Sequence, residues 1–467
     1  MLLTFQDFQD AGKDKGAFIS RAITNHKSSK EYRIARDADL YDRQQNSTIN
    51  SYVQRIFSLS GTPVEDFTAS NSKIASNFFH RLNTQRCAYS LGNGVSFASA
   101  RLQDDEFGGS ALVDSTKETL GKHFDVDLYN ICYKGLIHGV SFGFLYNDRL
   151  YCFPLTEFVP FWDEYDGTLG AGVRFWQLAP DKPMMAVLYE KDGYTKYASM
   201  VDGDSSILEV VQEKRPYILK IATIAATGDT AVVGAENYSS LPIVPFWGSK
   251  LKQSTLVGMK QAIDSFDLIR SGFANDLTDC SQVYWIVENC GGMNDEDLAR
   301  FRDRLHLSHI ASIPNADEGA AAKPYTQDIP YAARKQYLDD IRAGIYEDFG
   351  GLDVHTIAAG ATNDHIDAAY QPLDENADDF EYNVVEFIQQ LLSLKGIEND
   401  DPIFKRNRIS NQQEQVDMVL SAANYLDDRT ILEKLPFITV DEVARILKEK
   451  GAEDMERFDD VQDSEAE

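Results

Sequence analysis

Three short patterns in the sequence place chemically active residue types close together. Ser70 and Lys73 have the spacing of a serine nucleophile and its lysine base, but no partner motif follows them. His306 and His309 could share one face of a helix and bind a metal ion, yet no nearby Cys or third His completes a site. Residues 163–167 are rich in carboxylates but lack the twelve-residue ligand spacing of a calcium loop. We therefore predict no catalytic residue, no metal site and no cofactor.

The sequence also lacks the phosphate-binding loop of nucleotide-hydrolysing proteins, because it has no Gly-x-x-x-x-Gly-Lys-Ser/Thr stretch. Its five cysteines, an odd number at irregular spacing, indicate neither a disulfide framework nor a zinc site. We expect reduced thiols that pack as small apolar groups. The densest basic cluster, Lys405-Arg406-Asn407-Arg408, has no interleaved aromatic residue beyond Phe404. We interpret it as a strand edge or a subunit contact.

The charge balance excludes several classes of protein. Among 467 residues, 74 are acidic and 45 are basic, which gives a formal net charge of −29. Tight binding to DNA phosphates or to an anionic membrane needs clustered Lys and Arg, so both are disfavoured. With 26 Phe and 22 Tyr, the chain is predicted to build a large core and is not disordered as a whole. We also expect neither a signal peptide nor a membrane span, because no apolar run is long enough.

Periodicity divides the chain into regions that would position any functional residue. Residues 1–90 are predicted to be mainly helical, including one helix that begins near residue 71 and continues to residue 82. Another helix is predicted over 124–140, where Gly135 and Gly139 indicate close packing against a neighbour. Alternating residues and a hairpin signature at Asp192-Gly193 predict a mostly antiparallel β region over 141–250.

Two long helices are predicted over 254–281 and 329–349, on either side of a small insert, 282–328. One face of the first helix is apolar. The other face carries polar side chains, among them Asp264, Asp267, Ser271 and Asn275. The pair could be an antiparallel hairpin inside the core of a monomer, or it could be repeated around a ring with its polar side facing a channel. Spacing alone does not choose between these arrangements.

The last part of the chain begins with a glycine-containing loop, 350–363. A long helix follows from residue 364 to about residue 394, and Pro372 within it predicts a kink or a break. Two or three further helices are predicted over 401–450. The acidic tail, 451–467, is expected to be disordered.

Taken in order, several segments resemble the portal protein of tailed bacteriophages, in the branch typical of long-tailed phages of Gram-positive hosts. No single segment is specific, but the order and spacing of the segments together are. The resemblance covers roughly residues 20–445. The segments are HKSSKEY from residue 26, NSKIASNF from 71, YSLG from 89, GVSFGF from 139, FVP from 158, GVRFW from 172, LYEKDGY from 188, PIVPF from 242, IDSFD from 263, AND from 274, RNR from 406 and ISN from 409.

The resemblance implies an α+β ring subunit with a helical stem pair, a small α/β clip insert, a β-rich wing and a helical crown. Its parts map as a wing, 1–253; a stem helix, 254–281; a clip, 282–328; a second stem helix, 329–349; a tunnel loop, 350–363; a long kinked helix and wing return, 364–400; a crown, 401–450; and the tail, 451–467.

The resemblance also implies a non-enzymatic function in the virion, with assembly in the host cytoplasm and no membrane. The subunits would form a ring, usually a dodecamer, that conducts double-stranded DNA during packaging and ejection. The implied partners are the terminase large subunit, a head-completion adaptor, and the major capsid and scaffolding proteins. Candidate residues are His355, Thr356 and Asn363 in the tunnel loop; Asp264, Asp267, Ser271 and Asn275 facing the channel; and Tyr284, Trp285, Arg300 and Arg304 in the clip.

Two other functions are compatible with the sequence. One is a different phage head protein, such as a minor head protein. The other is a soluble acidic hydrolase with a cleft in the β region over 141–250. A hydrolase would need a convergent acid/base or metal cluster, and none stands out in the sequence.

Overall fold

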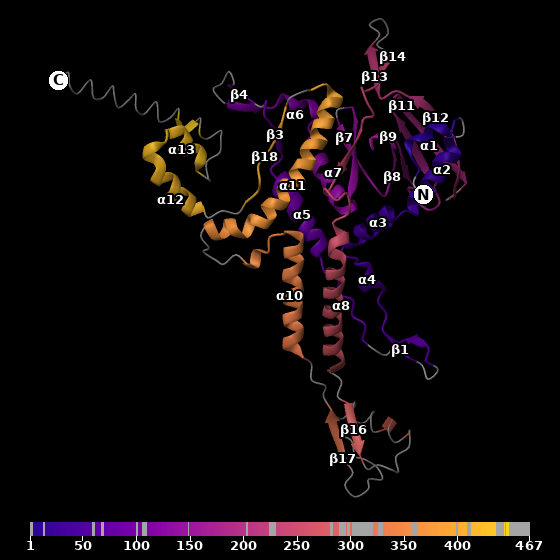
Figure 1. Ribbon diagram of the computed structural model, residues 1–467, viewed down its shortest axis with the longest axis vertical. Coiled ribbons are helices and arrows are strands. Elements are labelled where there is room, and N and C mark those ends of the chain that lie inside the picture. The colour runs from indigo at the N-terminus through magenta and orange to yellow at the C-terminus, as the bar shows by residue number, and fades with distance from the viewer. Residues whose placement is uncertain are drawn as a thin grey trace, which may run out of the picture. The chain divides into compact units, whose positions relative to one another are not determined.

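The structure is a computed structural model (Figure 1). It describes the chain from residue 3 to residue 447 except for 13–14, 58–60, 67–69, 100, 105–109, 148, 202–203, 224–229, 281–283, 289–295, 297–298, 301–320, 326–329, 357–362, 398–399, 409–411, 436–442 and 444. The chain divides into two units. The first comprises Met1–Gln44, Asn77–Lys260 and Ile345–Glu467, and the second comprises Gln45–Ser76 and Gln261–Gly344.

The β region predicted over 141–250 is confirmed as a set of antiparallel sheets in the first unit. A five-stranded sheet has the order β12-β11-β10-β9-β8 and a three-stranded sheet the order β15-β6-β7. The predicted hairpin is β10–β11, in which Tyr189 pairs with Tyr194. The strands are β6 (Val140–Tyr146), β7 (Arg149–Pro154), β8 (Phe158–Trp162), β9 (Leu169–Trp176), β10 (Met185–Glu190), β11 (Gly193–Val201), β12 (Asp204–Arg215), β13 (Ile218–Thr223), β14 (Thr230–Glu236) and β15 (Ile243–Trp247).

Helices and three further strand pairs complete the first unit. The paired strands are β13 with β14, β4 (Arg101–Asp104) with β5 (Ser110–Val113), and β3 (Val95–Phe97) with β18 (Pro402–Phe404). The helices are α1 (Phe5–Asp10), α2 (Lys15–Lys27), α3 (Lys30–Asp42), α5 (Phe78–Leu91), α6 (Ser115–Leu120), α7 (Phe124–His138), η1 (Val354–Thr356), α11 (Asn363–Lys395), α12 (Gln412–Ala422), η2 (Ala423–Tyr425) and α13 (Asp428–Lys434).

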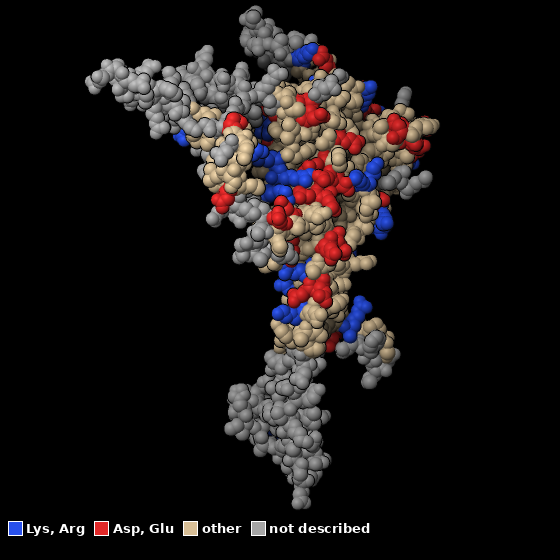
Figure 2. Space-filling view, turned by 60° about the vertical axis from the view of Figure 1, so that its left-hand side comes forward, with Lys and Arg blue, Asp and Glu red and all other residues tan. Residues whose placement is uncertain are grey.

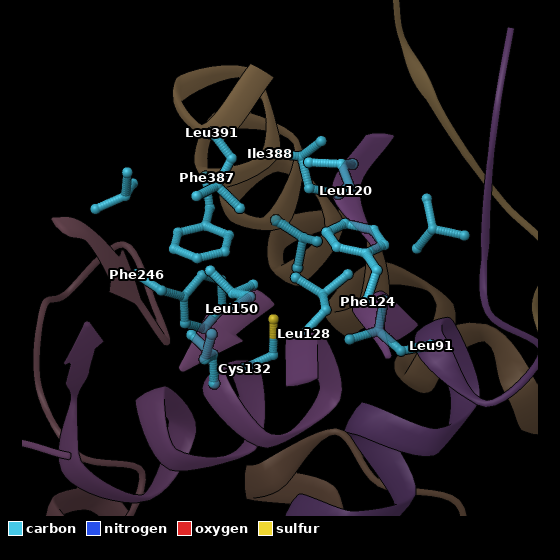
Figure 3. Close-up of a cluster of buried hydrophobic side chains, with 14 of the residues drawn as sticks. Leu91, Leu120, Phe124, Leu128, Cys132, Leu150, Phe246, Phe387, Ile388 and Leu391 are labelled. Atoms are coloured by element: carbon cyan, nitrogen blue, oxygen red, sulfur yellow. The ribbon is translucent and has the colours of Figure 1, made fainter. Parts of the chain in front are cut away.

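An apolar cluster between α7, β15 and α11 forms a core of this unit (Figure 3). Phe246, Phe387, Ile388 and Leu391 are at most 1% exposed there. Gly135 allows the close approach, since a Cβ at that position would lie 2.3 Å from the Phe246 ring. The close packing expected at this glycine is therefore confirmed.

The long helix predicted from residue 364 is α11, which is continuous through Pro372. Of the kink or break predicted at this proline, a break does not occur, and Figure 1 shows α11 as a bent helix. The basic cluster at 405–408 directly follows β18. The acidic tail lies outside the described residues. No helix in the described part of the chain is long and apolar enough to cross a membrane.

The second unit contains the two long helices and the insert between them. Its elements are α4 (Ser47–Ser51), β1 (Arg55–Phe57), β2 (Pro63–Glu65), α8 (Leu256–Cys280) from residue 261 on, β16 (Tyr284–Glu288), β17 (Ala321–Tyr325) and α10 (Tyr331–Phe349) up to residue 344. β1 pairs with β2 and β16 with β17, both antiparallel.

Candidate functional site

The polar face of α8 is the candidate site that sequence spacing singled out. Asp264, Asp267, Ser271 and Asn275 follow one another at intervals of three or four residues, so they lie along one side of the helix. The last three are only 0%, 2% and 3% exposed. Buried polar groups need hydrogen-bond partners, which here come from a segment earlier in the chain.

Residues 72–76 run antiparallel to α8 and hydrogen-bond to its side chains. The backbone N–H of Ser72 donates to Asn275 Oδ1 at 2.6 Å, that of Ile74 to Ser271 Oγ at 3.0 Å, and that of Ser76 to Asp267 Oδ1 at 2.9 Å. We call these three contacts the 72–76 ladder.

The ladder can form because the spacing of alternate residues in an extended segment is close to the rise of one helical turn. Two residues of extended chain advance about 6.6 Å. Four residues of α-helix advance about 6 Å. Every second backbone N–H of residues 72–76 therefore meets every fourth side chain of α8. The backbone N–H groups of this segment and the buried polar side chains of the helix thus supply each other with hydrogen-bond partners.

The ladder corrects two predictions. Residues 71–77 are not helical, and the helix begins at Phe78 as α5. A channel-facing role is also wrong for Asp267, Ser271 and Asn275, because the same subunit covers them. A sequence signal existed, since residues 70–77 contain three Ser and two Asn, which compete with helical hydrogen bonding.

Asp267 is the most buried member of this face. Its Oδ2 accepts a hydrogen bond from Asn46 Nδ2 at 2.5 Å, while its Oδ1 accepts from Ser76. Burial raises the pKa of Asp267, and the hydrogen bonds from Asn46 and Ser76 only partly offset that rise. Asp264 is half-buried and accepts a hydrogen bond from the Thr48 hydroxyl at 2.8 Å. Sequence reasoning had missed Asn46 and Thr48.

In the second unit, α8 and α10 lie antiparallel. Late residues of α8 meet early residues of α10: the rings of Phe273 and Tyr331 are 5.8 Å apart, and Arg334 forms an ion pair with Asp276. A groove of about 340 Å³ runs between the helices. It is lined by Phe266, Arg270, Phe273, Tyr331, Lys335, Leu338, Asp339 and Arg342.

The insert between these helices carries the clip candidates. Tyr284 and Trp285 lie on β16, opposite Tyr325 and Pro324 of β17. The exposed Arg300 forms an ion pair of 3.4 Å with Glu296. Arg304 lies outside the described residues. The structure thus places two of the four candidates on one strand.

The predicted loop over 350–363 starts from a fixed base in the first unit. Gln85 and Leu352 exchange two hydrogen bonds, each 2.9 Å long. The carbonyl of Phe349, at the end of α10, accepts hydrogen bonds from Arg86, at 3.2 Å, and from Asn376. Burial lowers the pKa of Arg86 to about 10. The base of the loop is therefore held by α5 on one side and α11 on the other.

The loop candidates lie around the undescribed residues 357–362. His355 is exposed in η1, and its backbone N–H donates to Asp353 Oδ1 at 3.1 Å. Thr356 ends η1 and Asn363 begins α11. The structure describes the side chain of neither Thr356 nor Asn363.

The short patterns that were considered and rejected as catalytic or metal sites have structural roles wherever the structure describes their residues. Residues 163–167 form a turn, in which Gly167 N–H donates to the Asp163 carbonyl at 3.1 Å. Lys73 Nζ donates to the Asn50 carbonyl at 2.7 Å. His306 and His309 lie outside the described residues. Across the described ranges, no three His, Cys, Asp or Glu residues gather as a metal site.

Comparison with known families gives a match over residues 21–456 to the phage portal protein family, SPP1 Gp6-like. The chain belongs to this family. The resemblance inferred from the sequence is thereby confirmed. Portal proteins of this family are structural, non-enzymatic components of the bacteriophage virion at the head–tail connector. The family excludes the acidic hydrolase considered above.

Two curated relatives are portal proteins. That of Clostridium phage phiCD119 is 29% identical over 235 residues, which are 48% of this chain and 51% of the relative. The matched region therefore spans about half the length of that protein. The portal protein of Bacillus phage SPP1 is 23% identical over 427 residues, covering 84% of this chain and 79% of the relative.

Among solved structures, the chain is similar to a chain from the neck of an empty GTA particle computed with C6 symmetry. The match covers 76% of this chain and 88% of that chain, at 12% identity and a TM-score of 0.38.

Proposed function

We propose that this chain forms a ring-shaped DNA conduit at one vertex of a phage capsid. We expect the ring to be a dodecamer, as is usual for portal proteins. The ring would take part in terminase-driven packaging, head–tail joining and genome ejection. The observation that carries this proposal is the family match, which extends over residues 21–456. Assembly would take place in the host cytoplasm, with the major capsid and scaffolding proteins as neighbours.

Within such a subunit, α8 and α10 would form the stem and the insert over 282–328 the clip. Residues 1–253 would form the wing and 401–450 the crown. The segment over 350–363 would form the tunnel loop, with His355, Thr356 and Asn363 as its candidate contacts to DNA. The fixed base of this segment supports the last assignment, because a loop that meets moving DNA needs rigid ends.

The charge of the chain supports a conduit. DNA has to slide through the ring without settling into deep electrostatic minima, and a wall of like charge repels its phosphates. The described part of the face in Figure 2 shows acidic and basic side chains interspersed, with no continuous basic band. The wall of the channel would come from side chains that are exposed in the subunit, because Asp267, Ser271 and Asn275 are covered by residues 72–76.

The clip would dock the terminase large subunit and later the head-completion adaptor, with Tyr284, Trp285, Arg300 and Arg304 as candidates. Deletion of residues 284–322 tests this. The variant should lose terminase binding in a pull-down while the first unit keeps its thermal transition. Normal DNA packaging by heads that carry the deletion would refute the assignment.

Size-exclusion chromatography with light scattering, followed by negative-stain microscopy, tests the ring itself. The expected particle is a closed ring of about twelve subunits with a central opening. A chain that stays monomeric at high concentration, with and without scaffolding protein and across salt concentrations, would contradict the proposal.

A further inference from the structure

The segment that contains the basic cluster lies across the first unit as a strap. Its strand β18 pairs with β3, so that Phe404 lies opposite Val95. After the strand, the Lys405 carbonyl accepts a hydrogen bond from Asn93 Nδ2 at 2.9 Å, and the Asn407 N–H donates to the Tyr89 carbonyl at 2.9 Å. The backbone that carries the arginines is therefore held by hydrogen bonds to β3 and to the end of α5.

Arg406 binds α11 on the C-terminal side of Pro372. Its guanidinium lies 3.0 and 2.9 Å from the two carboxylate oxygens of Glu381 and 3.2 Å from Asp374, and it also pairs with Asp378. These three acids lie on one face of the helix, because they are spaced by four and three residues. The hydrogen bonds to Glu381 and Asp378 raise the pKa of Arg406, so it stays charged.

Arg408 binds α11 on both sides of Pro372. Its Nη2 lies 3.2 Å from Asp367 Oδ1, before the proline, and 3.1 Å from Asp374 Oδ2, after it. Its guanidinium carbon also lies 5.1 Å from the centre of the Tyr370 ring. Within the described residues, the ion pairs that link the two sides of this proline are those of Arg408.

Pro372 is the weak point of α11. It has no N–H, so the carbonyl of residue 368 loses its helical hydrogen bond, and helices bend at such positions. The turns before it, Asn363–Gln371, pack through Ile366 and Tyr370 against Tyr89 and Leu352. The same cluster contains Leu373 and Ala377 from beyond the proline, and the Tyr89 hydroxyl donates to Asp374 at 2.6 Å, so the buried side of the bend is packed. Arg408 adds the electrostatic tie on its acidic, solvent-facing side.

We propose that Arg408 is a positioning residue that sets the direction of the first turns of α11 across Pro372. Arg406 fixes the remainder of the helix, and Arg408 ties the turns before the proline to it. These turns directly follow residues 357–362. If the proposed function holds, Arg408 thereby sets where the DNA-facing loop ends. Only this link to the loop rests on the proposed function.

Hydrogen–deuterium exchange of the full chain, read by mass spectrometry, tests the proposal. In Arg408→Gln, amides of residues 367–371 should exchange at least about fivefold faster, whereas those of 380–392 should keep their rates. About 1 M NaCl should produce the same local change in the unmodified chain, because exposed ion pairs are screened by salt. Lys405→Gln is the matched control: it removes an equal charge from an exposed neighbour and should leave all of α11 unchanged.

A second variant makes the test specific to the partner. Asp367→Asn should accelerate the same amides, and adding it to Arg408→Gln should bring little further change, because both remove one interaction. The proposal is overturned if Arg408→Gln leaves 367–371 unchanged, if all of α11 loosens equally, or if the two substitutions act additively. The measurement concerns the folded subunit, so a failure to form rings would contradict the proposed function and leave this result standing.

Discussion

In the first unit, α7, β15 and α11 meet through buried apolar rings and aliphatic side chains, whereas in the second unit α8 meets residues 72–76 through hydrogen bonds. Apolar contacts are non-directional and scale with the area removed from water. Buried hydrogen bonds add little when formed but cost a great deal when one partner is lost. The first unit should therefore tolerate conservative exchanges of size, and the second should depend on the identity of individual polar side chains.

The largest effect should come from the apolar core. Phe387→Ala removes a ring that is 1% exposed, and it should lower the free energy of unfolding by about 3–5 kcal/mol. Leu178→Ala is the control, because that side chain is 86% exposed and should change little. Urea unfolding followed by circular dichroism measures both. Equal urea midpoints for the two variants would contradict the claim that apolar packing stabilises the first unit.

The second effect concerns the ladder. Asp267→Ala leaves the Ser76 N–H without its acceptor and Asn46 Nδ2 with only the Ser76 carbonyl, so the second unit should lose about 2–3 kcal/mol of stability. Asp264→Ala serves as the matched control at a half-buried carboxylate on the same helix face. Limited proteolysis within residues 45–76 reports the change. Faster cleavage is expected in the Asp267 variant, and identical cleavage in both variants would mean that burial of Asp267 is unimportant.

The two units should also respond oppositely to acid. Burial lowers the pKa of His26 in the first unit from its ordinary 6.5, and this neutral ring pairs with the Leu155 carbonyl at 2.8 Å. The unfolded chain binds the proton more readily, so stability falls as pH drops below about 6.5, by at most about 2 kcal/mol at pH 5.

Asp267 has a raised pKa, so its protonation favours the folded state and its contribution grows as pH falls through that pKa. Thermal unfolding between pH 7.5 and 5 should show the first unit weakening, and His26→Gln should flatten that slope. An unchanged slope in this variant would assign the pH dependence to other groups.

The sequence predicted what apolar periodicity encodes. The long helices α8, α10 and α11, the antiparallel β region and the glycine contact at Gly135 all follow from patterns of side-chain size and hydropathy. These patterns reflect contacts that any residue of similar size would make. The elements can therefore be inferred without knowing which segment packs against them.

Polar contacts were harder to predict because one polar face fits water, a channel or another segment equally well. The face of α8 was interpreted as a channel wall, and its partner was predicted to be helical. The Ser- and Asn-rich composition of residues 70–77 disfavoured a helix there, but it did not identify α8 as the partner. Likewise, Arg406 and Arg408 indicated a basic cluster, while their carboxylate partners lie more than twenty residues earlier in the chain.

The central claim is that Asp267, Ser271 and Asn275 on α8 are covered inside the subunit by residues 72–76. Amide hydrogen exchange of the unmodified full chain, resolved to single residues by fragmentation, tests it most directly. The N–H groups of Ser72, Ile74 and Ser76 should exchange at least about 100-fold more slowly than in an unstructured peptide, because each donates to a buried side chain. Exchange of all three at the rate of the unstructured peptide would contradict the claim.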